Sequence, residues 1–243
     1  MVMNIVVILM ILFIAYIWAT QGVFSALVHF VCTLAAGAVA FGVWEPLVLN
    51  VLIGVREDIA WGVGLVGPFL LTLVLLRLVA DRVVPANLDF DDATNFVGGA
   101  IFGAGAGVLT AGIFVIGIGF LSAPASFLGY QPVAFTQTGS LQRQSNLWVP
   151  ADMLTARLYE AASVGGFGTS RPMAVYQPDV HEQAALVRMT FDNKSRTTVA
   201  PDDFKVVGRY EVTAESVGEL LSDSFNLSLE GEPDRKSTRL NSS

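Results

Sequence analysis

A glycine-spaced apolar run at residues 96–121 is the feature that most limits how this chain can fold. It reads FVGGAIFGAGAGVLTAGIFVIGIGFL and contains no charged residue. As a helix rising ~1.5 Å per residue it would reach about 39 Å, more than the ~30 Å hydrocarbon core of a bilayer. Gly99, Gly103, Gly107 and Ala111 recur every fourth position and therefore share one helical face. Such a face lets another helix approach closely, so we predict a transmembrane helix that packs in a bundle.

Three more apolar segments precede this run, and the fold class predicted for residues 1–121 is an all-α bundle of four transmembrane helices. The first segment lacks the basic start of a signal peptide and is therefore expected to stay as a span. Pro68 predicts a kink in the third span, and Arg77 near its end can reach the headgroups. The four predicted spans are about 3–19, 23–43, 61–79 and 96–121.

The connections between the spans carry most of the polar residues of this half. Residues 20–22 are short enough to make the first two spans an antiparallel hairpin. Trp44 stands where an interfacial aromatic is expected, and the apolar stretch PLVLNVLIGV that follows is too short to span comfortably. We expect it to lie along the interface or to re-enter it. Thr94 or Asn95 is expected to cap the fourth span.

Charge divides the chain into a membrane part and a polar tail. Only three of the fourteen basic residues, Arg56, Arg77 and Arg82, precede residue 122. We predict a linker at 122–146 and a small α+β or partly disordered extramembrane module at 147–233. Within the module, 151–163 is predicted as a helix that follows Pro150, and 173–176 and 205–212 as strands; 181–191 fits either helix or strand. Residues 234–243, DRKSTRLNSS, resemble a translated sequencing adapter and are expected to be non-native.

The candidate binding residues are few, and no catalytic, cofactor or metal site is predicted. His29 and Cys32 lie three apart, but the chain has one other histidine and no other cysteine, so we interpret them as a packed polar spot. Asp89, Asp91 and Asp92 lack the glycine and distal glutamate of a calcium loop and are interpreted as a solvated loop that favours the helix start. The GGFG at 165–168 lacks the lysine of a phosphate loop.

Net charge and the distribution of arginines bear on partners and orientation. A net charge of −7 argues against binding to nucleic acid or docking on anionic lipid. Arg82 belongs to the 80–95 connection, and Arg77 lies just inside the membrane next to it. Because basic residues favour the cytoplasm, we place this connection there and the side that carries Arg56 outside. Four spans then place both the N-terminus and the tail on the non-cytoplasmic side.

The layout resembles the CvpA (colicin V production) family of bacterial membrane proteins over about residues 3–121. That family has four helices, a first hairpin with an Arg-Gly-Phe type turn, and a fourth helix that opens Asp-Arg-x-x-Gly-x-x-x-Gly-x-x-Arg-Gly. The turn here is Gln21-Gly22-Val23, and the fourth helix carries Gly99, Gly103 and Gly107. Uncharged residues stand at four places where the family often has charges: Gln21, Asn95, Phe96 and Ala106.

The resemblance implies an inner-membrane protein linked to colicin V export, a toxin-related process, or more broadly to envelope functions. Some relatives carry a trypsin-like serine protease after the fourth helix, which would place the tail outside the cytoplasm. The tail here has one histidine, His181, and no Gly-x-Ser-Gly turn.

The favoured hypothesis is a non-enzymatic membrane scaffold or accessory factor of CvpA type. The expected partners are the lipid bilayer, a second copy through the fourth helix, and an unknown protein for the tail. One alternative is an oligomeric channel or permease component. Another is the anchor of an enzyme, such as a serine protease, whose domain is lost by truncation.

Overall fold

A computed structural model describes ten stretches of the chain. They are residues 2–52, 57–84, 90–121, 127–131, 133–135, 141–143, 147–165, 172–184, 228–229 and 232–233. The chain divides into two compact units, Met1–Thr198 and Val199–Ser243. In the first unit, four helices are long and apolar enough to cross a membrane, so the predicted all-α four-helix membrane fold is confirmed. The chain is a multi-pass membrane protein.

Each of the four helices contains one predicted span almost entirely and extends beyond it. Their bounds are α1 Val2–Gln21, α2 Val23–Leu47, α3 Glu57–Val83 and α4 Asp92–Gly119. Long apolar runs favour helices in lipid because a helix satisfies its backbone hydrogen bonds internally. Pro68 lies inside α3.

The apolar stretch after Trp44 continues α2 instead of forming a separate interfacial segment. Pro46 is accommodated in the last turn of α2, and a π-helical turn, η1 Val48–Leu52, follows directly. The Val48 N–H donates to the carbonyls of Trp44 and Glu45, and the Asn50 side chain donates to the Pro46 carbonyl at 2.7 Å. These bonds keep the chain helical past the proline through residue 52.

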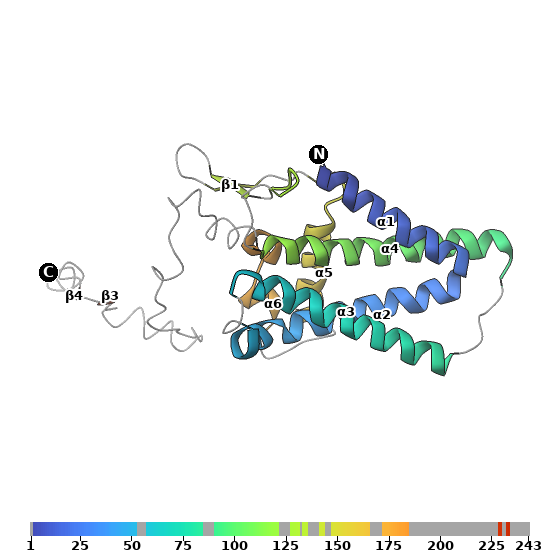
Figure 1. The fold of residues 1–243 in the computed structure, drawn as a ribbon, viewed down its shortest axis with the longest axis horizontal. Helices are drawn as coiled ribbons and strands as arrows, with labels where there is room; N and C mark the ends of the chain where they lie inside the picture. Colours follow the sequence, from blue (N-terminus) through green and yellow to red (C-terminus); the bar gives the residue numbers. More distant parts are fainter. Residues whose placement is uncertain are drawn as a thin grey trace. The chain divides into compact units, whose positions relative to one another are not determined.

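α4 is the centre of the bundle. In Figure 1, α1 lies on one side of α4, and α2 and α3 lie on the other. α4 has the largest buried share of the four helices and α3 the smallest. The outward faces of α1 and α3 carry large apolar side chains, among them Leu12, Phe13, Leu71 and Val74. In a bilayer such a surface contacts lipid, which explains why it is apolar without being packed in the protein.

The bundle has two distinct ends. At one, here called the capped end, α1 begins, η1 ends, α3 begins and α4 ends. The backbone N–H of Met3 donates there to the Leu128 carbonyl at 3.1 Å. At the other, here called the hairpin end, α1 turns into α2 and α4 begins. Gly22 makes this turn with φ 92°, a conformation that favours glycine.

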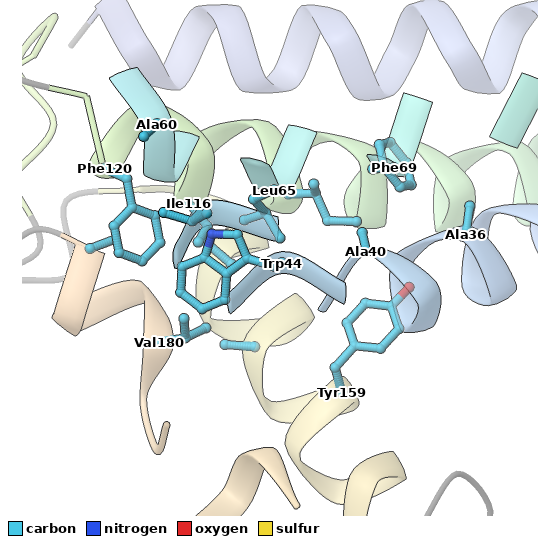
Figure 2. Close-up of a cluster of buried hydrophobic side chains, with 14 residues drawn as sticks. Ala36, Ala40, Trp44, Ala60, Leu65, Phe69, Ile116, Phe120, Tyr159 and Val180 are labelled. Carbon is cyan, nitrogen blue, oxygen red and sulfur yellow. The ribbon is translucent and has the colours of Figure 1, made fainter. Parts of the chain in front are cut away.

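An aromatic cluster packs between the helices at the capped end, and Trp44 is at its centre (Figure 2). Trp44, which the sequence suggests as an interfacial aromatic, packs inside the bundle, and its side chain is only 2% exposed. Its ring lies 4.9 Å from that of Phe120 and 5.4 Å, edge-on, from that of Trp61. Its indole N–H donates to the Trp61 carbonyl at 3.0 Å. The extension of α2 carries Trp44 into the bundle, where its polar atom finds a backbone partner.

Short elements follow α4 in the first unit. The predicted helix 151–163 is confirmed as α5 Ala151–Val164, with Pro150 at its N-cap. The predicted strand at 173–176 is wrong, because α6 Met173–Tyr176 is a helical turn that follows Pro172. Residues 180–184 are helical as well. Within the predicted linker, β1 Val133–Phe135 pairs antiparallel with β2 Leu141–Arg143.

In the second unit, the structure describes one antiparallel pair. β3 Ser228–Leu229 pairs with β4 Glu232–Pro233. The strand predicted at 205–212, the adapter-like residues 234–243 and the last three residues of the GGFG at 165–168 lie outside the described residues.

Candidate functional site

The small-residue face of α4 lies against α1. A side-chain carbon added at Gly99 would come within 2.6 Å of the Trp18 carbonyl oxygen, and one at Gly103 within 2.9 Å of the Ala15 Cα. Gly107 approaches the backbone of α1 in the same way, and Ala111 is fully buried beside α1. Close backbone approach of this kind is how small residues join membrane helices. The small-residue face of α4, which was considered as a contact with a second copy of the chain, is therefore covered by α1 of the same chain.

A polar cluster joins three helices inside the hairpin end. The Arg77 guanidinium on α3 donates to the Ser25 hydroxyl on α2 at 2.9 Å and to the Ser25 carbonyl at 3.4 Å. It also pairs with Asp81 at 2.9 Å and lies 4.9 Å over the ring of Trp18 on α1. The Trp18 ring stacks on that of His29 at 4.1 Å. Arg77 thus turns inward rather than toward headgroups, because Ser25 and Trp18 offer it partners in the bundle.

His29 and Cys32 both pack inside the bundle on α2. The Nδ1 atom of His29 is buried and has no hydrogen-bond partner in the described part of the chain. Cys32 is a buried free thiol. The ring of His29 stacks on that of Trp18.

The start of α4 is capped by Asp91, not by Thr94 or Asn95 as predicted. The Asp91 carboxylate accepts the Thr94 backbone N–H at 3.0 Å and the Thr94 hydroxyl at 2.6 Å. These bonds to the charged carboxylate lower the pKa of Asp91. Asn95 lies one turn inside the helix and donates to the Phe90 carbonyl at 2.9 Å. Asp92 lies in the first turn of α4, and Asp89 is outside the described residues.

α5 docks directly on the bundle, and two glycines make room for it. A side-chain carbon at Gly112 of α4 would overlap the Thr155 hydroxyl and the Ala151 carbonyl; one at Gly37 of α2 would overlap the Tyr159 hydroxyl. That hydroxyl donates to the Leu34 carbonyl at 3.1 Å. Burial raises the pKa of Tyr159, which keeps the hydroxyl protonated as a donor.

Residues before α5 make polar contacts with α5 and with the bundle that the sequence did not predict. The Tyr130 hydroxyl donates to the Asp152 carboxylate, and both side chains are buried. The Trp148 backbone N–H donates to the Asn4 side chain at 2.8 Å. Asn4 is the lone polar residue in the first half of α1, which was the only sequence signal for this contact.

These contacts describe a bundle with a fixed C-terminal segment, here defined as residues 147–165 and 172–184. A scan against protein-family models found no match, and searches of curated proteins and of solved structures also found none. The function is therefore argued from the geometry.

Proposed function

We propose that this protein is a non-enzymatic membrane scaffold or accessory factor of the CvpA (colicin V production) type, located in a bacterial inner membrane. The observation that carries the proposal is the docking of α5 on α2 and α4 at Gly37 and Gly112. The docked helix makes the C-terminal segment and the bundle one continuous surface at the capped end. A scaffold needs such a fixed surface, because a partner then binds without the cost of ordering a free segment.

The outer faces of the helices support the same function. The apolar outward faces of α1 and α3 suit contact with lipid, while the capped end carries polar residues of α5 such as Arg157 and Glu160. A protein partner in export or envelope assembly would therefore meet the capped end and leave the lipid-facing sides free.

Complementation of a CvpA-deficient strain tests the proposal. Colicin V secretion is measured after expression of the wild-type chain, Gly112→Leu and Gly67→Leu, with the amount in the membrane checked by immunoblot. Gly67 is exposed with nothing within 4 Å of an added side-chain carbon, so it is the matched control for Gly112. We expect the wild type and Gly67→Leu to restore secretion and Gly112→Leu to fail. A wild-type chain that reaches the membrane without restoring secretion would overturn the CvpA-type function.

The side of the membrane on which the capped end lies is tested separately. Alkaline phosphatase or a fluorescent protein is fused after Leu141, in β2. We expect phosphatase activity, which places the capped end outside the cytoplasm and directs the search for partners there. Fluorescence without phosphatase activity reverses the proposed orientation.

A second candidate function, a channel or permease component, is favoured by the polar cluster at the hairpin end. Ionisable residues inside membrane segments usually mark transport paths, and Arg77 and His29 both lie within spanning helices. Vesicles that contain the purified chain are loaded with a small solute, and leakage is compared with that of protein-free vesicles. Leakage that Arg77→Met changes would favour this function over the scaffold.

A further inference from the structure

Three potential metal ligands meet beside the aromatic cluster of the capped end, outside the contacts described above. They are Asp179, His181 and Glu182, and each offers one ligand atom within 4.8 Å of the others. The backbone N–H of Asp179 donates to the Glu160 carboxylate of α5 at 2.7 Å. This bond fixes the start of the helical residues 180–184 against the docked helix.

His181 gives a second and independent reason to expect a ligand here. The residue is only 8% exposed, and its Nδ1 atom is buried without a hydrogen-bond partner in the described ranges. A buried polar atom without a partner is unfavourable and is uncommon in native proteins. A ring nitrogen of the same side chain is among the clustered ligand atoms. A bound cation would satisfy a buried imidazole of this kind.

We propose that Asp179, His181 and Glu182 bind a divalent transition-metal ion, with Zn²⁺ as the best fit. One imidazole nitrogen and two carboxylate oxygens form a set of donors that Zn²⁺ accepts, whereas Ca²⁺ and Mg²⁺ prefer oxygen donors alone. Tetrahedral ligands at about 2.1 Å from Zn²⁺ lie about 3.4 Å apart. The ligand atoms, all within 4.8 Å of one another, therefore need to draw together by at most about 1.4 Å, which side-chain rotation can supply.

The ion would stabilise the capped end, because the ligands belong to a segment that touches three parts of the bundle. The Gln177 side chain meets Glu45 at the end of α2 at 3.4 Å, and Ala184 packs against Gly119 at the end of α4. Glu160 supplies the contact with α5. The proposed site does not depend on the scaffold function.

The test uses the full chain in detergent, stripped of metal with a chelator and titrated with Zn²⁺ by calorimetry. We expect one Zn²⁺ per chain for the wild type and an affinity at least about 10–100-fold weaker for His181→Gln. The matched control is His29→Gln, because His29 is the only other histidine and also has a buried, unpartnered Nδ1. Its affinity should equal that of the wild type. Equal Zn²⁺ affinity in wild type and His181→Gln, or displacement of Zn²⁺ by equimolar Mg²⁺, overturns the proposal.

Two carboxamide variants keep the test decisive if His181→Gln does not fold. Asp179→Asn and Glu182→Gln preserve size and remove one charged ligand each, and both should weaken Zn²⁺ binding. Hydrogen exchange adds a structural readout: Zn²⁺ should slow exchange in residues 172–184 of the wild type and much less in either variant. Wild-type affinity and wild-type slowing in both variants would show that zinc binds elsewhere.

Discussion

The hairpin end and the capped end of the bundle are held together by different kinds of contact. At the hairpin end, Gly99 and Gly103 let the α4 backbone meet that of α1, and Arg77 adds a small polar cluster. At the capped end, the rings of Trp44, Trp61 and Phe120 pack together beside a close approach of α3 to the α4 backbone at Gly62. Both ends use close approach at glycines, and they differ in the side chains added to it: a polar cluster at the first end and an aromatic cluster at the second.

This difference indicates which end can accept additional structure. The capped end carries α5, seated at Gly37 and Gly112, and the helical residues 180–184. The docked segment contributes Tyr159 and Val180 to the same buried cluster as Trp44 (Figure 2). The capped end is therefore the part of the bundle whose stability depends on the C-terminal segment.

Loss of the central aromatic side chain is expected to have the largest effect. Trp44→Ala removes a fully packed ring and should lower the free energy of unfolding by about 3–5 kcal/mol. Trp44→Phe keeps much of the bulk but loses the bond to the Trp61 carbonyl, which should cost about 1 kcal/mol. Alkylation of Cys32, the single and buried cysteine, reports unfolding in detergent. Trp148→Ala is the control, because that side chain is 67% exposed. A comparable loss of stability in this variant would contradict the central role of Trp44 in the aromatic cluster.

Added bulk at the hairpin end should have the next largest effect. Gly103→Leu forces α4 away from the α1 backbone and should lower the free energy of unfolding by about 1–3 kcal/mol. Gly67→Leu adds the same side chain to open space on α3 and should be neutral or slightly stabilising, because leucine favours helix over glycine. The same Cys32 alkylation assay compares the two variants. Equal effects would mean that α1 and α4 do not depend on close approach.

The hairpin end was largely predictable from the sequence, for a physical reason. The spacing of Gly99, Gly103 and Gly107 places small residues on one face, and periodicity along a single helix is visible in the sequence. The spans followed from hydropathy in the same way. The identity of the covering helix α1, the inward turn of Arg77 and the cap by Asp91 needed the structure.

The capped end could not be predicted, because its contacts join residues far apart in the chain. Trp44 at the end of an apolar run was compatible with an interface position, and only the continued helix through Pro46 brings it into the core. The hydrogen bonds Asn4–Trp148 and Tyr159–Leu34 join residues more than 120 positions apart. The polar Asn4 in an apolar helix indicates a contact but not its partner, and Tyr159–Leu34 has no sequence pattern, because both partners are set by the tertiary packing around α5.

Removal of the partly buried Arg77 cation should have a smaller effect than either change in packing. Arg77→Met should cost about 1–2 kcal/mol, since it removes hydrogen bonds from a charged donor to Ser25. Arg77→Lys keeps the charge but loses the planar fork that contacts two atoms of Ser25, so we expect an intermediate loss. Arg82→Met removes an exposed arginine one turn further along α3 and should leave stability unchanged. Thermal unfolding in detergent makes the comparison, and equal losses for both arginines would show that the charge, not the cluster, matters.

The smallest effect is expected from loss of Asp91, the N-cap of α4, which lies at the hairpin end. Asp91→Ala removes the acceptor for the Thr94 N–H, so exchange protection should fall at Thr94 while the middle of α4 stays protected. Because the pKa of Asp91 is lowered in the folded chain, its charged form stabilises the cap. This contribution is complete above the ordinary Asp pKa, near pH 4, and is lost as the pH falls through the lowered pKa. Protection factors at Thr94 in the wild type should therefore approach those of Asp91→Ala only in acid. Asp92→Ala keeps the Asp91 cap and should retain protection at Thr94. If this variant loses protection at Thr94, the negative charge near the helix N-terminus, rather than the Asp91 hydrogen bond, stabilises the start of α4.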